Sequence, residues 1–306
     1  MNYKWAACSL AGNMLPGHEE RQIAEEASAR PKLADDVFCY PQPETWRTRI
    51  GEMLADYITD DVKAEFVRNP PEYVVSDDLG WLDDIIFAVT HRTCDIKELM
   101  GERLGREYRA FRAGHATRTS DLAPFYMQGL KCLRAEEIED RARTIFLNGR
   151  YECANEERLQ RAINDIEARK KFGGREGRLY FAAEESSLFT RIGSSGHYLI
   201  YGSEYLYCLG MRVTSTWETK RALKEIGRPT MLVCDIPIAL LSPYTLKEFG
   251  GMMLEFLFCE LVDGLESCAL SPGSGSAFSL MIDLPPEHIV GHYHPASIYD
   301  PLWASG

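Results

Sequence analysis

The spacing of apolar residues predicts that the first hundred residues are mostly helical. Between residues 44 and 68, apolar positions recur with the i, i+3 and i+4 spacing of a helix, and Pro70-Pro71 ends the run. The same spacing returns over 82–104 after the possible cap Ser76-Asp77-Asp78. A strand is not expected in this part beyond a short extended piece.

From about residue 107 the pattern changes to strands alternating with helices. Strands are predicted at 107–119, 178–183, 197–203, 229–238 and 277–283. Helices are predicted at 121–130, 134–148, 155–171, 203–213, 216–226 and 245–262. The tail after 284 contains too many prolines and glycines for a regular helix. The sequence therefore predicts an α+β fold, with a helical N-terminal region (1–105) and a mixed-sheet domain (106–306).

Two glycine-rich segments interrupt the predicted strands and helices of residues 106–306. FGGREG (172–177) is predicted to be a loop and the internal hinge, and SPGSGS (271–276) a turn or loop. Neither has the spacing of a dinucleotide-binding or P-loop glycine motif.

Composition narrows the classes of function. With 34 basic and 46 acidic residues in 306, the net charge of −12 disfavours a protein that coats DNA or an anionic membrane. The nine cysteines form no C-x-x-C pair, which excludes a zinc knuckle and favours reduced thiols. The longest apolar run, GMMLEFLFCELV, is too short to span a bilayer. We expect a cytoplasmic protein without a signal peptide or membrane partner.

The first candidate site is the end of the strand at 107–119. Alternation places His115 and Thr117 on one face, and Arg118 lies where the strand gives way to loop. An imidazole and a hydroxyl can hydrogen-bond a ribose, and a guanidinium binds phosphate. The alternative is a surface turn with a partly buried histidine.

The second candidate site is the aromatic segment that follows two Gly-Ser turns at 193–196. Tyr201 next to Gly202 offers a flat platform for an aromatic ring. The structural alternative is equally strong, because Ser203 is a natural helix N-cap and Glu204 suits the first turn.

The third candidate is the histidine cluster of the tail. Glu287, His288, His292 and His294 suggest a metal, but Gly291 and Pro295 disfavour the helix that would bring two of the histidines together. No HExxH pattern supports a metal site. The rim of an active site or a packed C-terminal extension is the preferred interpretation.

Taken in chain order, these segments resemble the ADP-ribosyltransferase fold, the NAD-binding domain of bacterial toxins and poly-ADP-ribose polymerases. The resemblance covers about 107–295. It rests on FRAGHATRTSDLAPFYMQGL with His115, Thr117, Arg118 and Gly129-Leu130, on HYLIYGSEYLYCLG with Tyr201 and Ser203, and on AFSLMID near the C-terminus. It implies a transferase that uses NAD.

One position departs from the family pattern. The family carries a catalytic Glu at the start of its last strand, and AFSLMID has none. Glu204 is the substitute, in a manner similar to toxin relatives of the RES type, which use an Arg, a mid-domain Glu and a late Ser. On that variant the Arg is Arg178 or Arg118, and the Ser is Ser276 or Ser279.

The resemblance also implies roles for individual residues. His115, Tyr201 and Glu204 would be catalytic, with Tyr201 stacked on the nicotinamide and Glu204 stabilising an oxocarbenium ion. The NAD-binding residues would be Thr117, Arg118, Arg178, Tyr180 and Ser203. Arg118 would bind the pyrophosphate. The family implies a toxin or anti-phage effector that modifies nucleic acid or protein, with an antitoxin or chaperone as partner.

Two other classes of function stay open. A metal-independent RNase-like toxin would use His197, His292 and His294 as acid and base, with Arg118 or Lys131 near the phosphate. A non-enzymatic interaction protein would use its acidic surface and helical region, and would have no site near His115 and Tyr201.

Overall fold

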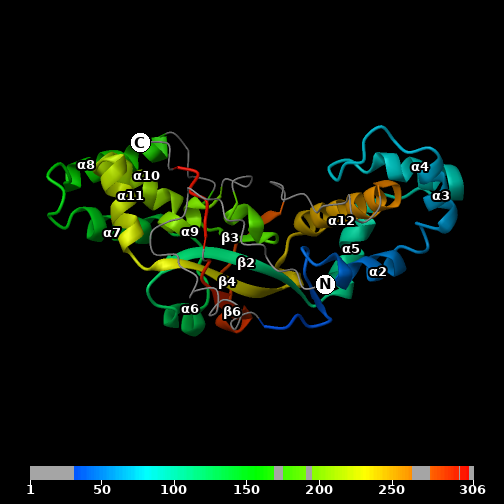
Figure 1. Ribbon diagram of the computed structural model, residues 1–306, viewed down its shortest axis with the longest axis horizontal. Coiled ribbons are helices and arrows are strands. Elements are labelled where there is room, and N and C mark those ends of the chain that lie inside the picture. The colour runs from blue at the N-terminus through cyan, green and yellow to red at the C-terminus, as the bar shows by residue number, and fades with distance from the viewer. Residues whose placement is uncertain (1–30, 169–174, 191–194, 264–275, 296, 303–306) are drawn as a thin grey trace. The chain divides into compact units, whose positions relative to one another are not determined.

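The computed structural model describes residues 31–168, 175–190, 195–263, 276–295 and 297–302. These residues form helices and one six-stranded sheet (Figure 1), which confirms the mixed α/β class. The strand order is β5-β3-β2-β4-β6, and β1 pairs parallel with β2. The strands are β1 (Val37–Phe38), β2 (Ala110–Thr119), β3 (Leu179–Ala182), β4 (Arg228–Pro237), β5 (Ala277–Leu280) and β6 (Ile289–Tyr293).

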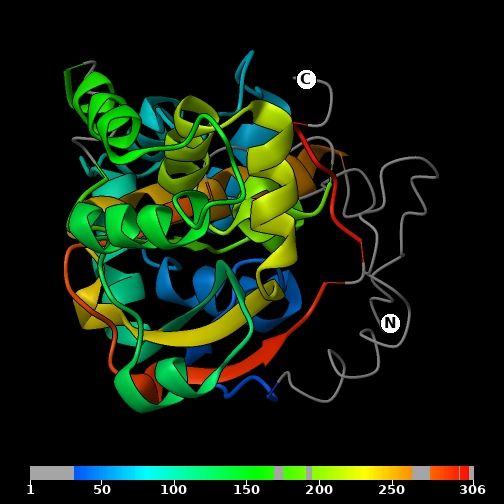
Figure 2. The same ribbon diagram turned by 90° about the vertical axis from the view of Figure 1, so that its left-hand side faces the viewer.

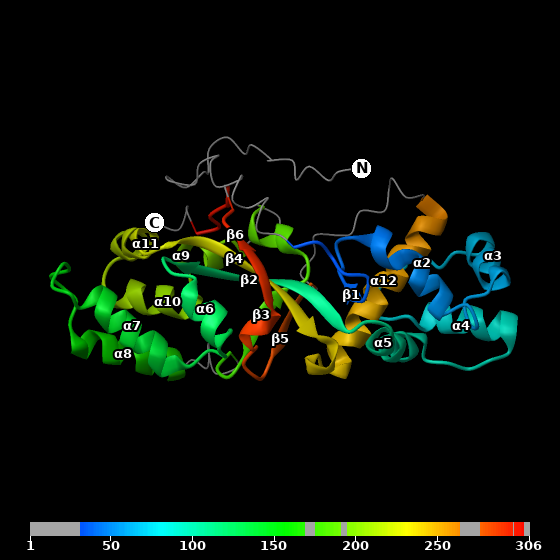
Figure 3. The same ribbon diagram turned by 90° about the horizontal axis from the view of Figure 1, so that it is seen from below.

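The chain divides into two compact units. The described parts of 33–112 and 235–271 form one, here the helical unit, and the described parts of 113–234 and 272–306 belong to the other, the sheet unit. The sequence placed a division at 105/106 and assigned the helix at 245–262 to the second part. That helix, α12 (Pro243–Asp263), packs instead along α5 (Ile96–Glu107) in the helical unit (Figure 3).

Close approach of α5 and α12 explains the glycines on their facing sides. A Cβ on Gly101 would lie 3.0 Å from the backbone nitrogen of Lys247, and a Cβ on Gly250 would lie 3.0 Å from Cγ of Met100. The unit also contains α2 (Pro43–Met53), α3 (Asp60–Arg68), α4 (Gly80–Thr90) and the 3₁₀ turn η2 (Ile238–Leu240). The single helix predicted over 44–68 is thus two helices, because Thr59 caps a new start by accepting from the Val62 N–H.

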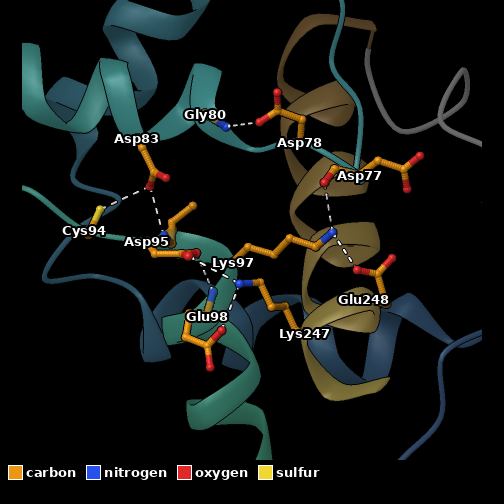
Figure 4. A network of polar contacts seen from close by, with 11 residues as sticks. Asp77, Asp78, Gly80, Asp83, Cys94, Asp95, Lys97, Glu98, Lys247 and Glu248 are labelled. Atoms are coloured by element: carbon orange, nitrogen blue, oxygen red, sulfur yellow. Dashed lines mark hydrogen bonds and ion pairs between the residues drawn. The ribbon is translucent and has the colours of Figure 1, made fainter. Parts of the chain in front are cut away.

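A buried lysine connects α5 to α12. The Lys97 ammonium lies 2.8 Å from a carboxylate oxygen of Glu248 and donates to the Asp77 carbonyl at 3.1 Å (Figure 4). Lys97 is only 7% exposed. Beside it, Lys247 lies 2.8 Å from Glu98. Because these groups come from both helices and from the loop before α4, the network joins three segments of the helical unit.

Lys97→Met is expected to lower the free energy of unfolding by about 2 kcal/mol, since it leaves Glu248 and the Asp77 carbonyl without their buried cation. Partial hydration of Glu248 limits the loss. Urea denaturation monitored by circular dichroism measures it. The double variant Lys97→Met/Glu248→Leu should recover part of the loss. An equal or larger loss in the double variant would contradict this explanation.

In the sheet unit, most helices cover one face of the sheet and α6 lies against the other (Figures 1 and 2). The core under the helices includes Phe146 and Leu206 from helices and Met231 and Tyr293 from strands. The helices are α6 (Ala123–Gln128), α7 (Ala135–Phe146), α8 (Glu156–Ala168), α9 (His197–Tyr201), α10 (Glu204–Val213) and α11 (Thr216–Glu225). Two 3₁₀ turns complete it, η1 (Glu185–Leu188) and η3 (Pro286–His288).

The structure corrects one prediction of secondary structure in the sheet unit. The strand predicted at 197–203 is the short helix α9, which buries Leu199, Ile200 and Tyr201 and ends at Gly202 with φ +78°. A five-residue apolar run fits either structure, and packing decided it. The described tail contains no α-helix, as predicted, but it does contain the strand β6, in which Tyr293 pairs with Met231 of β4.

Over the described residues, the other predicted strands and helices of the second part are confirmed to within three residues at their ends. Residues 172–174 of the predicted hinge and 271–275 of the Ser/Gly-rich loop lie outside the described residues. Among the helices of the described ranges, none has the length and apolar character needed to cross a membrane.

Candidate functional site

Three side chains form a polar cluster at the start of α10, here the Glu204 cluster. Arg175 donates from Nη1 to the Glu204 carboxylate and, at 3.1 Å, to the Tyr198 hydroxyl. The Tyr198 hydroxyl donates to Oε2 of Glu204 at 3.2 Å. The Arg175 and Glu204 side chains are 36% and 32% exposed, so this ion pair is open to solvent.

Local sequence positions this cluster. Ser203 caps α10 by accepting from the Leu206 N–H, which makes Glu204 the first residue of the helix. A carboxylate at this end is favoured by the helix dipole. Gly177, with φ +70°, turns the chain between Arg175 and β3. The N–H of Arg178 donates to the Arg175 carbonyl at 3.2 Å, so the same turn holds both arginines.

A second contact lies on the neighbouring strands. Arg178 donates from Nη1 to the Ser279 hydroxyl at 3.2 Å, and Ser279 is the register partner of Tyr180. Tyr180 is 43% exposed. Burial raises the pKa of Tyr198, and the neighbouring Arg175 opposes this rise. By alternation along β3, Tyr180 shares the face of Ala182, which belongs to the core under the helices. The candidate site therefore combines Arg175, Arg178, Tyr180, Tyr198, Glu204 and Ser279.

The structure separates His115 from Glu204. Gly114 pairs with Ala182, which belongs to the core under the helices, so the next residue, His115, faces the other side of the sheet. Its ring lies 5.8 Å from that of Phe181. By alternation Thr117 shares this face. These two predicted site residues do not join the Glu204 cluster.

His115 is held as a neutral ring. Its Nδ1 lies 2.9 Å from the Tyr180 carbonyl, which can only accept, so Nδ1 carries the hydrogen. Burial lowers the pKa of His115 below 6.5, and the bond to Tyr180 opposes this.

The lowered pKa of His115 predicts a loss of stability in mild acid. Because the unfolded chain binds a proton on this ring more readily, its contribution to stability is complete above about pH 6.5 and is lost as the pH falls below it. His115→Gln keeps a donor to the Tyr180 carbonyl and removes the titration. Melting temperatures between pH 7.5 and 5.5 should fall less in the variant than in wild type. Parallel curves would contradict the assignment.

The environment of Arg118 does not match its predicted role in binding the pyrophosphate of NAD. Its guanidinium is buried, donates to the carbonyls of Lys224, Ile226 and Gly227, and so binds the end of α11. Burial lowers its pKa to about 10. In this structure the side chain is not presented to a pyrophosphate, because it is buried and two of its three nitrogens, Nε and Nη2, donate to backbone carbonyls.

Tyr201 is also buried, which removes the predicted stacking surface. It is 2% exposed, and its hydroxyl donates to Asp300 at 2.6 Å. Burial, with the neighbouring Asp300, raises the pKa of Tyr201 well above its usual value. Lys224 completes the contact, 3.2 Å from Asp300. Ser203 caps α10, which is the structural role that the sequence offered as the alternative to NAD binding. Of the two predicted aromatic residues, only Tyr180 has an exposed side chain.

Two histidines of the tail are neighbours, since the rings of His292 and His294 lie 5.5 Å apart. His292 shares a hydrogen bond of 2.8 Å with the Tyr126 hydroxyl, on the α6 side of the sheet. His294 is 1% exposed and contacts the Pro229 carbonyl at 3.1 Å. His197 instead lies 4.0 Å from Glu204. In the described ranges, no group of three or more His, Cys, Asp or Glu is arranged to hold a metal ion. The burial of His294 does not favour the RNase-like alternative.

Sequence reasoning missed Arg175 and Tyr198. Arg175 stands in the segment interpreted as a loop, and Tyr198 in the segment predicted as a strand. The available signal was the pair of arginines three residues apart before a strand that carries an exposed tyrosine. Comparison of the chain with protein-family models, curated proteins and solved structures finds no match.

Proposed function

We propose that this protein is an NAD-dependent ADP-ribosyltransferase whose active site is the Glu204 cluster together with Arg178, Tyr180 and Ser279. The observation that carries the proposal is the contact between Arg178 and Ser279 beside the pair of Arg175 and Glu204. An Arg, a mid-chain Glu and a late Ser are the residue types that the RES-type resemblance requires. Of the alternatives left open by the sequence, this contact favours Arg178 over Arg118 and Ser279 over Ser276.

The donor set suits the parts of NAD. Two guanidinium groups on one turn suit a diphosphate, which binds arginine through charge-assisted hydrogen bonds. The exposed ring of Tyr180 takes the stacking role that the sequence gave to Tyr201. Tyr198 orients the carboxylate of Glu204 by donating to it.

Glu204 would act where positive charge develops. When the bond between C1′ of the ribose and the nicotinamide nitrogen breaks, its electron pair leaves with neutral nicotinamide. The carboxylate of Glu204 stabilises the resulting oxocarbenium ion. An acceptor hydroxyl or amine then bonds to C1′, and its proton passes to Glu204.

We propose nucleic acid or protein as the acceptor, and a toxin or anti-phage role in the cytoplasm with an antitoxin or chaperone partner. This part rests on the family resemblance alone. The net charge of −12 disfavours tight binding to long stretches of DNA, so a short or protein acceptor is the better fit.

The proposal is tested by incubating the purified full chain with NAD and measuring free nicotinamide by mass spectrometry. Binding of NAD is measured in parallel by calorimetry. Release of nicotinamide is the expected result. If the protein neither releases nicotinamide nor binds NAD, the proposal is wrong.

A further inference from the structure

One of the two arginines of the candidate site is paired with a carboxylate. Arg175 and Arg178 lie on one turn, and Arg175 is engaged by Glu204. Among the described residues nearby, the carboxylate of Glu176 accepts from the Ala135 N–H at 3.5 Å, and the His197 ring lies 4.0 Å from Glu204. The arginine best placed to bind an anion is thus held by the carboxylate proposed for catalysis.

We infer that Arg175 is a phosphate-binding residue for which Glu204 and the diphosphate of the ligand compete. The identity of the ligand rests on the proposed function. When a diphosphate binds, Arg175 turns from the carboxylate to the phosphate oxygens. Glu204 then keeps the hydroxyl of Tyr198 as its donor and regains its full negative charge.

Geometry and exposure make this exchange feasible. A guanidinium binds a carboxylate and a phosphate through the same planar set of donors, so one replaces the other without a new arrangement. The pair is about one-third exposed on both sides, and ion pairs of this kind are weak. A diphosphate offers more negative charge than one carboxylate, and Arg178 binds it from the same turn. Ligand binding therefore prepares Glu204 for the oxocarbenium ion.

Competition predicts that removal of the carboxylate tightens binding. We expect Glu204→Gln to bind pyrophosphate and ADP-ribose about fivefold more tightly than wild type, the factor set by a weak exposed ion pair. Arg175→Ala should bind both ligands more weakly than wild type. In the Arg175→Ala background, Glu204→Gln should give no gain. Isothermal calorimetry on the full chain, without turnover, measures all four proteins.

The matched control is Glu225→Gln. Glu225 also pairs with arginines, Arg150 at 3.3 Å and Arg221 at 3.2 Å, and its removal changes the net charge equally. Its affinity for pyrophosphate should equal that of wild type. Adenosine, which carries no phosphate, should bind all variants alike. Urea denaturation of each variant confirms that the fold is retained.

Three results would overturn the inference: equal or weaker binding of pyrophosphate by Glu204→Gln, a gain that persists without Arg175, or no binding of pyrophosphate to any variant. A failure of the proposed transferase function would give a different result from a failure of this inference. If wild type binds pyrophosphate in the expected pattern but releases no nicotinamide from NAD, the competition stands and the transferase does not.

Discussion

Glu204→Gln is expected to reduce the rate of nicotinamide release from NAD by at least about 10²-fold, the range seen when one group that stabilises developing charge is removed. The substitution keeps the shape of the side chain and an acceptor for Tyr198, but removes the negative charge. Mass spectrometry of the reaction gives the rate, and calorimetry gives NAD binding. Release should be lost while binding is kept or strengthened.

Two controls distinguish this loss from a loss of structure. Glu225→Gln removes a carboxylate elsewhere in the sheet unit and should leave the rate unchanged. The unfolding free energy of Glu204→Gln should lie within about 1 kcal/mol of wild type, because the Ser203 cap is untouched and the helix-dipole and ion-pair contributions are weak at an exposed site. Full activity in Glu204→Gln would remove this residue from the mechanism.

Arg118→Ala is expected to lower the free energy of unfolding by about 3 kcal/mol, because three partly buried carbonyls lose a charged donor. Relief of the buried charge offsets part of the loss, as the lowered pKa of Arg118 indicates. Urea denaturation measures the change. The folded fraction should still bind NAD.

Arg178→Ala is the matched comparison. Its guanidinium contacts Ser279 at the partly exposed edge of the site, so stability should change by less than about 1 kcal/mol while NAD binding weakens. Were Arg118→Ala stable but unable to bind NAD, and Arg178→Ala the reverse, the pyrophosphate would belong to Arg118 as the sequence predicted.

The sequence by itself determined most elements, because their signals are local. Helical periodicity predicted α4, α5, α7, α10, α11 and α12, and alternation or apolar runs predicted β2, β3, β4 and β5. The cap at Ser203 and the helix end at Gly129 followed from residue type. Glu204, Arg178 and Ser279 were named from a resemblance that gave two choices for both the Arg and the Ser.

Only the tertiary structure decided how these elements combine. The segment at 197–201 became a helix because its apolar side chains fill the core over the sheet, and β6 formed because β4 offered it a partner. The same long-range contacts buried Tyr201 against Asp300 and Arg118 against the end of α11, and brought Arg175 to Glu204. Burial and pairing depend on residues far apart in the chain, and local pattern holds no information on those distances.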